Sequence, residues 1–295
     1  MIDQQLLQKV LEIQIEDPIT FSNLGLSNSS MPNTLSFIDD VKYLSDINEN
    51  KNITGVICTP EFKSLLTKKT VLVTDARFSF YTLHNHIAVE SKKTIPSEID
   101  QSATISPNCY IHSENVIIGK NTVIQPNVTI LGDVEIGDNC FIQSGTVIGS
   151  EGYEYKKTSQ GILPVVHDGK VIIGNFVHIG ANTCVDKGFS FRNTIIGNQV
   201  KIDNLIHVAH GVNIQEGAFI IAGTTIGGSC TIESDSWLSI NSSIAPGITV
   251  KKKGFVSIGA VVTKDVNENE QVTGNFAIPH GQFIAKLKRS QDQKE

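Results

Sequence analysis

Histidine is the residue type in this chain best suited to moving protons near neutral pH, because its imidazole titrates there. The chain has 8 histidines, and two of them, His207 and His210, lie three residues apart in the segment KIDNLIHVAH that ends at His210. Gly228 follows His210 by eighteen residues. A glycine has no Cβ, so another group can approach its backbone N–H closely. Whether His210 and Gly228 meet depends on the elements that carry them.

Those elements follow from an internal period of six residues. An aliphatic residue recurs at every sixth position from Ile118 to Ile148 and again from Ile196 to Val262. Each hexad reads as a short strand and a turn, and three hexads close a triangular coil whose inward apolar residues stack into a column. The pattern predicts about eight coils of a parallel β-helix. In such a coil, eighteen residues is one full turn, which places Gly228 directly above His210.

Five cysteines are spread through the chain: Cys58, Cys109, Cys140, Cys184 and Cys230. The number is odd and no C-x-x-C pair occurs, so neither a disulfide framework nor a zinc site follows from the spacing. We predict no metal ligands. Three of the cysteines fall at the fourth residue after an inward isoleucine, where a small apolar side chain fits, and we predict packing roles for Cys109, Cys140 and Cys230.

The overall composition excludes several classes of protein. A net charge of −6 and a pI of about 5.8 argue against a partner bound through a phosphate backbone. No apolar run approaches the roughly 20 residues of a membrane span, and the N-terminus lacks the pattern of a signal peptide. We expect a soluble cytoplasmic protein.

Three regions differ in pattern. Residues 1–98 lack hexads and predict a small α/β domain, residues 99–266 predict the β-helix, and residues 267–295 form a C-terminal segment with one short helix at 282–288. Within the hexads, residues 150–170 break the six-residue step and must leave the coil. An excursion from a rigid solenoid is a candidate functional loop.

Over nearly its whole length the chain resembles the UDP-3-O-acylglucosamine N-acyltransferases, hexapeptide-repeat enzymes that add the N-linked acyl chain in lipid A synthesis. The segments that carry the resemblance are LSFIDDVKY (35–43), GSEGY (149–153), VHIGANTCVDKG (177–188) and KIDNLIHVAH (201–210). The resemblance implies a mainly β fold, in which a left-handed parallel β-helix follows the small N-terminal α/β domain in the sequence. It also implies a homotrimer with active sites in clefts between parallel coils.

The resemblance assigns roles to particular residues. His210 matches the catalytic histidine and Gly228 the oxyanion donor, and we expect Asp203 to orient His210. Phe37 and Tyr43 match two aromatic positions that sandwich a uracil. The remaining predicted substrate-binding residues are Asp40 in that segment, Glu151 and Tyr153 in the excursion, and His207 in a secondary role.

The chain departs from the family at three places. Gly247 stands where the family has a second functional histidine, and Asp40 replaces an asparagine, which leaves both UDP and dTDP sugars open. The ending resembles coenzyme-A-dependent acetyltransferases and lacks long carrier-docking helices. These departures predict a donor site at Gly247, Lys252, Lys253 and Gly259.

We therefore predict an N-acyltransferase that moves an acyl group from a thioester, with acyl-CoA favoured, to the amine of a UDP- or dTDP-linked amino sugar. The product would serve lipopolysaccharide or surface-glycan synthesis, and no cofactor would be bound permanently. One alternative is the lipid A enzyme itself, with acyl carrier protein as donor. An alternative of another class is a non-catalytic β-helix that binds sugar nucleotides or acts as a scaffold.

Overall fold

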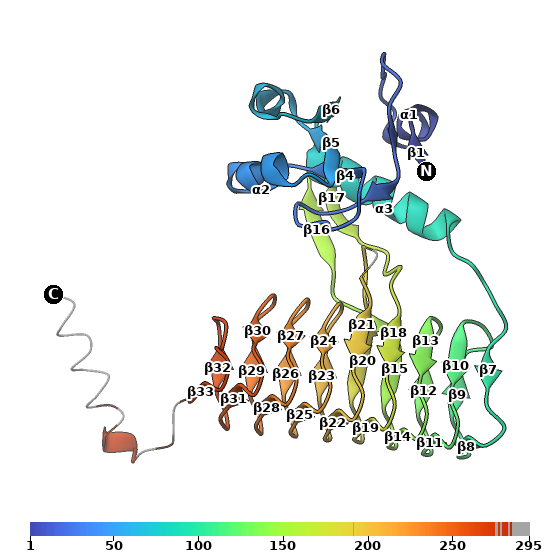
Figure 1. Cartoon of the computed structure of the whole chain (residues 1–295), viewed down its shortest axis with the longest axis vertical. Helices are drawn as coiled ribbons and strands as arrows, with labels where there is room; N and C mark the ends of the chain where they lie inside the picture. The colour runs from blue at the N-terminus through green and yellow to red at the C-terminus, as the bar shows by residue number, and fades with distance from the viewer. Residues whose placement is uncertain (191, 275–276, 278, 283, 285–295) are drawn as a thin grey trace.

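The computed structural model describes residues 1–190, 192–274, 277, 279–282 and 284. Figure 1 shows two parts, a small N-terminal domain and a long stack of coils beneath it. In the part of the chain that is described, no helix combines the length and the apolarity that crossing a membrane requires.

The N-terminal domain is built on a four-stranded parallel sheet of order β3-β4-β5-β6. Two of its helices start at aspartates whose side chains accept a backbone N–H, Asp3 from Leu6 at 2.9 Å and Asp75 from Phe78 at 2.8 Å, which are N-caps. The predicted α/β domain is thus confirmed. Its elements are β1 (Ile2–Asp3), α1 (Gln4–Leu11), β2 (Thr20–Phe21), β3 (Asn23–Leu24), β4 (Thr34–Phe37), η1 (Val41–Tyr43), α2 (Leu44–Glu49), β5 (Ile53–Cys58), η2 (Pro60–Leu65), β6 (Lys69–Leu72) and α3 (Ala76–Glu90).

The coils form three parallel sheets that enclose one apolar column. Successive strands of a sheet come from successive coils, as where Thr225 pairs with Ser243 one coil later. The first sheet contains β7 (Glu98–Ile99), β10 (Val116–Ile118), β13 (Val134–Ile136), β18 (Val171–Ile173), β21 (Thr194–Ile196), β24 (Asn213–Ile214), β27 (Thr231–Ile232) and β30 (Thr249–Val250).

The other two sheets repeat this arrangement on the remaining sides of the triangle. The second contains β8 (Thr104–Ile105), β11 (Val123–Ile124), β14 (Phe141–Ile142), β19 (His178–Ile179), β22 (Lys201–Ile202), β25 (Phe219–Ile220), β28 (Trp237–Leu238), β31 (Phe255–Val256) and β33 (Gln271–Val272). The third contains β9 (Tyr110–Ile111), β12 (Thr129–Ile130), β15 (Val147–Glu151), β20 (Cys184–Lys187), β23 (His207–Val208), β26 (Thr225–Ile226), β29 (Ser243–Ile244) and β32 (Val261–Val262).

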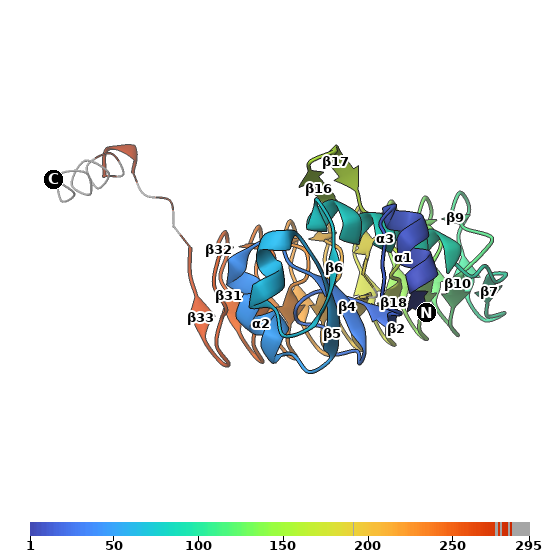
Figure 2. The ribbon, with the colours of Figure 1, turned by 90° about the horizontal axis from the view of Figure 1, so that it is seen from above.

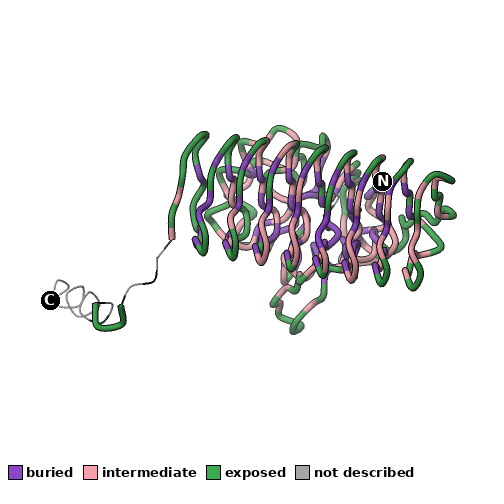
Figure 3. The backbone as a smooth tube through the Cα atoms, turned by 90° about the horizontal axis from the view of Figure 1, so that it is seen from below, coloured by how far each residue is buried: buried purple, intermediate pink, exposed green. Residues whose placement is uncertain are grey.

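The predicted inward residues form the core. Ile124, Ile130 and Ile226 are fully buried, and buried positions recur around every coil (Figure 3). Cys140 and Cys230 are buried in the column and Cys109 packs against it, as predicted. Many corners are turned by asparagines in the left-handed region of backbone conformation, which asparagine tolerates better than most residues.

The limits of the β-helix differ slightly from those predicted. Its first strand, β7, already includes residue 98, because it pairs with β10. At the other end β33 pairs with β31 and carries the stack to residue 272. The predicted terminal helix at 282–288 falls largely outside the described residues.

The excursion is a β-hairpin that reaches from the coils to the N-terminal domain. Its strands are β16 (Tyr155–Thr158) and β17 (Gly161–Pro164), and Figures 1 and 2 show it against α3. The amide of Asn85 on α3 donates to the Pro164 carbonyl and accepts from the Val166 N–H, both at 2.8 Å. Val165 is buried in the core of the N-terminal domain. The excursion therefore fixes that domain to the β-helix.

Candidate active site

Gly228 lies directly above His210 on one edge of the triangular coil, and Gly247 lies on the same edge one coil further on, one residue out of register. Each follows a strand of the third sheet, and backbone hydrogen bonds join their levels: the Ser229 N–H donates to the His210 carbonyl, and the Gly247 N–H to the Gly228 carbonyl, both at 2.9 Å. The excursion at 150–170 leaves the coil at this same edge, as does a shorter loop whose described residues are 188–190 and 192–193. The stacking of Gly228 on His210 predicted from the period is present.

The imidazole of His210 lies directly against the backbone of Gly228. A Cβ added to Gly228 would come within 2.6 Å of Nε2 of His210, closer than real Cβ contacts allow. Gly228 is buried, and its N–H donates to no acceptor among the described residues. A buried N–H without a partner is uncommon. The Gly228 N–H is therefore available to donate to a ligand beside His210, the candidate general base.

Burial of His210 favours the neutral form of its ring. Burial holds the pKa of His210 below its ordinary value of 6.5, while the Glu154 carboxylate opposes this shift. Smaller influences come from His167 and Arg192, which lower the pKa, and from Asp186, which raises it. The side chain is 13% exposed, and its buried Nδ1 has no hydrogen-bond partner. A neutral imidazole with an open nitrogen can accept a proton.

The carboxylate nearest to His210 belongs to Glu154, which sequence reasoning missed. Its Oε2 lies 3.5 Å from Nε2 of His210, and the Lys156 ammonium contacts the same carboxylate. Lys156 also lies over the ring of Tyr81 of the N-terminal domain, 4.7 Å from its centroid. Glu154 is in the irregular excursion, where no period indicates which side chains face the coil.

The prediction that Asp203 orients His210 is wrong. The Asp203 carboxylate accepts hydrogen bonds from the Asn204 backbone and side-chain amides at 2.8 and 2.7 Å and from the Ala222 N–H at 3.2 Å. Asp203 stands at the corner before β23 and His210 at the corner after it. One strand therefore separates the two residues, and Asp203 stabilises its own corner.

His167 is a second histidine in the site that the sequence did not single out. It is 3% exposed, its ring lies 5.8 Å from that of His210, and neither ring nitrogen has a hydrogen-bond partner. Gly152 lies between the two rings, since a Cβ there would come within 2.8 Å of His210 and 2.9 Å of His167. Buried polar groups without partners are costly in a folded protein. The ring nitrogens of His167 can therefore bind a polar group of a ligand.

The predicted nucleotide-binding residues line one cavity of about 750 Å³ between the N-terminal domain and the excursion. Phe37, Asp40 and Tyr43 all contribute to it. Phe37 packs against Phe80 with ring centroids 4.5 Å apart, and Asp40 pairs with Lys42 at 3.0 Å. Side chains that the sequence did not single out complete the lining, among them Arg77, Tyr81, Tyr155, Lys156 and Lys157. The cavity thus offers aromatic rings and four cations, although Asp39, Asp40 and Asp46 also line it and Arg77 is paired with Asp39 at 2.6 Å.

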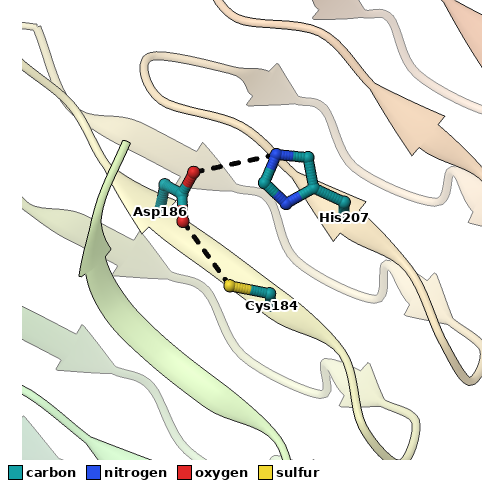
Figure 4. A group of neighbouring side chains, drawn as sticks. All are labelled: Cys184, Asp186 and His207. Atoms are coloured by element: carbon teal, nitrogen blue, oxygen red, sulfur yellow. Dashed lines mark hydrogen bonds and ion pairs between the residues drawn. The ribbon is translucent and has the colours of Figure 1, made fainter. Parts of the chain in front are cut away.

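The other predicted substrate-binding residues lie elsewhere. Glu151 lines a second cavity, of about 600 Å³, with His167 and Lys187, and its carboxylate lies 3.7 Å from the Lys187 ammonium. Tyr153 is 87% exposed and outside the nucleotide cavity, although its ring lies 5.0 Å from that of Tyr155, which lines it. His207 is half-buried, with Nε2 3.7 Å from an oxygen of Asp186 (Figure 4).

The four predicted donor-binding residues do not come together within the chain. Gly247 shares the edge of His210, and a Cβ added to it would meet no atom within 4 Å. Lys252 and Lys253 lie at the corner between the first and second sheets, and Gly259 at the corner between the second and third. Residues separated by one hexad fall on different edges of a triangular coil, so proximity in sequence does not place them at one site.

Comparison with known proteins agrees with the resemblance. The family described as bacterial transferase hexapeptide (six repeats) matches residues 115–150. UDP-3-O-acylglucosamine N-acyltransferase of Bordetella pertussis is 36% identical over 167 residues, which cover 52% of this chain and 44% of the relative. The enzyme of the same name from Coxiella burnetii is 26% identical over 247 residues, covering 74% of this chain and 71% of that protein.

A solved structure supports the same fold. The crystal structure of Francisella novicida UDP-N-acetylglucosamine acyltransferase matches with a TM-score of 0.55 and 27% identity, over 60% of this chain and 63% of that one. The fold is a left-handed parallel β-helix of hexapeptide repeats, as predicted. The chain is similar to curated acyltransferases, although it spans less than half the length of the Bordetella relative.

Proposed function

From its similarity to the UDP-3-O-acylglucosamine N-acyltransferases, we propose that this chain transfers an acyl group from a thioester to the amine of a nucleotide-linked amino sugar. One observation carries the proposal: the buried imidazole of His210 lies against Gly228, whose N–H donates to no acceptor among the described residues. A base and an oxyanion donor side by side are what acyl transfer to an amine requires. A scaffold protein needs neither.

The proposed reaction runs through these two groups. Nδ1 of His210 is buried, so Nε2, which lies 3.5 Å from the Glu154 carboxylate, is the ring nitrogen that a substrate can reach. Through Nε2, the neutral imidazole removes a proton from the sugar amine as the amine nitrogen bonds to the thioester carbon, and the carbonyl oxygen becomes an oxyanion held by the Gly228 N–H. The C–S bond then breaks, and the imidazolium returns the proton to the leaving thiolate. An amide and a free thiol result, and charge and protons balance.

The cavity of Phe37 and Tyr43 suits the nucleotide of the acceptor. Aromatic rings stack on a pyrimidine base, and Arg77, Lys156 and Lys157 supply positive charge for a diphosphate. Lys156 contacts Glu154, which in turn faces His210, so a sugar extended from this cavity points toward the base. His167, buried beside His210 with two open ring nitrogens, is positioned to bind that sugar.

Two substrate pairs remain to be compared. The name of the relatives favours UDP-3-O-acylglucosamine as the acceptor, and in that alternative an acyl carrier protein is the donor. The second candidate is a short acyl-CoA with a UDP- or dTDP-linked amino sugar, and it rests on the departure from the family at Gly247 and on the acetyltransferase-like ending. Mass spectrometry of reactions that pair each acceptor with each donor distinguishes the two. If no pair of substrates gives a product and the chain still binds sugar nucleotides, the non-catalytic alternative is favoured.

Activity is expected to fall in acid as His210 becomes protonated. Because burial lowers the pKa of His210, the acid limb of kcat/KM lies below pH 6.5. The Glu154 carboxylate raises this pKa against the effect of burial, so Glu154→Gln should move the acid limb to still lower pH. The pH profiles of kcat/KM for the two proteins measure the change. A limb that stays in place or moves to higher pH would exclude this role for Glu154.

We expect the chain to assemble as a homotrimer. On the outer face of the second sheet, Phe219, Trp237 and Phe255 are 40, 37 and 37% exposed and stack with ring centroids 5.1 and 6.2 Å apart. Exposed apolar surface of this kind commonly marks an interface. Light scattering should give three times 32.1 kDa, and Trp237→Glu should lower that mass. A monomeric parent protein would contradict the assignment.

A further inference from the structure

Three side chains with metal-binding atoms lie close together on the outer face of the third sheet: Cys184, Asp186 and His207. The Cys184 thiol, an Asp186 carboxylate oxygen and a ring nitrogen of His207 lie within 4.8 Å of one another. Figure 4 shows the Asp186 carboxylate between the other two side chains. The individual separations are 3.5 Å from Sγ to Oδ1 and 3.7 Å from Oδ2 to Nε2.

We propose that these three side chains form a binding site for a divalent transition metal ion, with Zn²⁺ as the best fit. Around a tetrahedral zinc with bonds of about 2.0–2.3 Å, ligand atoms stand about 3.3–3.8 Å apart. The separations of 3.5 Å and 3.7 Å fall within that range, although they involve the two different oxygens of Asp186, and all three ligand atoms lie within 4.8 Å of one another. Rotation of the side chains brings one carboxylate oxygen, the thiol and the imidazole to bonding distance of one ion. Thiolate, carboxylate and imidazole are all zinc ligands, and a thiolate disfavours Mg²⁺ and Ca²⁺.

The sheet holds the three ligands in place. Cys184 and His207 are direct register partners on the adjacent strands β20 and β23. Asp186 follows Cys184 by two positions, so both face the same side of the sheet. A site on paired strands is more rigid than one on loops.

The remaining contacts of Asp186 suit a metal ligand. It is 5% exposed and accepts a hydrogen bond from the Ser150 hydroxyl at 2.7 Å. A carboxylate that binds a metal ion is usually held by a hydrogen bond from a neighbouring side chain, the role that Ser150 would have here. A buried carboxylate also needs a compensating positive charge, and the half-exposed His207 provides only a contact beyond hydrogen-bond length. Three protein ligands leave the fourth position of the ion for water or a ligand atom from solution.

Cobalt(II) provides a test that does not depend on acyl transfer. The chelator-treated full chain should bind one Co²⁺, with a thiolate-to-cobalt charge-transfer band and the visible spectrum of a tetrahedral ion, and Zn²⁺ should displace it. Cys184→Ser should abolish the charge-transfer band. Asp186→Asn and His207→Gln should each weaken binding by about tenfold or more, since even outer-shell changes can cost that much.

Cys109→Ser is the matched control, because Cys109 is another partly buried coil cysteine outside the cluster. It should bind Co²⁺ as the parent chain does, and circular dichroism of each variant checks that the β-helix is intact. The proposal is overturned if the parent shows no charge-transfer band, or if the band persists in a folded Cys184→Ser protein. Neither result would bear on His210 and Gly228.

Discussion

Replacement of His210 by alanine is expected to lower kcat by about 10²–10⁴ while the protein stays folded, which is the range that a general base contributes. The ring is 13% exposed and lies outside the apolar column, so its removal costs the fold little. The KM for the acceptor should change much less than kcat, because the proposed nucleotide cavity lies away from the ring. Steady-state kinetics on the substrate pair identified by mass spectrometry measure both.

His112→Ala serves as the control for that variant. His112 follows β9 as His210 follows β23, so both occupy the same edge of the β-helix, several coils apart. The control should retain the activity of the parent protein. Equal losses in the two variants, or full activity in folded His210→Ala, would reject His210 as the base.

Gly228→Ala is expected to lower kcat by about 10²-fold or more, comparable to the loss of an oxyanion donor. The added Cβ would come within 2.6 Å of Nε2 and 3.0 Å of Nδ1 of His210. The imidazole, the backbone or both must then move, which displaces the base and the N–H from each other. One methyl group thus disturbs both halves of the proposed mechanism, and the kinetic assay is the same as for His210→Ala.

Gly132→Ala is the matched control for this second variant. Gly132 also follows a strand of the third sheet, β12, and a Cβ there would meet only ordinary contacts of 3.5 Å or more. We expect normal activity from it and a thermal midpoint close to that of the parent. If Gly228→Ala folds and turns over normally, the close approach of the ring to the glycine backbone has no catalytic role.

Not all of the site was accessible from sequence. The pair His210 and Gly228 could be predicted from the sequence, because the period determines which residues stack and the resemblance indicates which histidine is catalytic. Asp203 was assigned wrongly, because closeness along the chain was taken for closeness in space although a corner of the coil intervenes. Glu154 and His167 were missed because they lie in the excursion, where no repeat relates position in the chain to position in space.

The sequence by itself determined the β-helix, its apolar column and the edge that carries His210. Hydrogen bonds between parallel strands pair each residue with one in the next coil, so the six-residue period determines which residues stack. The left-handedness of the coil came from the resemblance and not from the period. The tertiary structure alone decided how the 150–170 hairpin folds back. Val165 packs into the N-terminal domain and Asn85 hydrogen-bonds to the hairpin, and these contacts determine its position. They join segments with no common period.

The cluster of Cys184, Asp186 and His207 likewise depended on the tertiary structure. The shorter loop that follows β20 lies between the two strands that supply it, so the pairing of Cys184 with His207 follows from the sheet register and not from a count of residues.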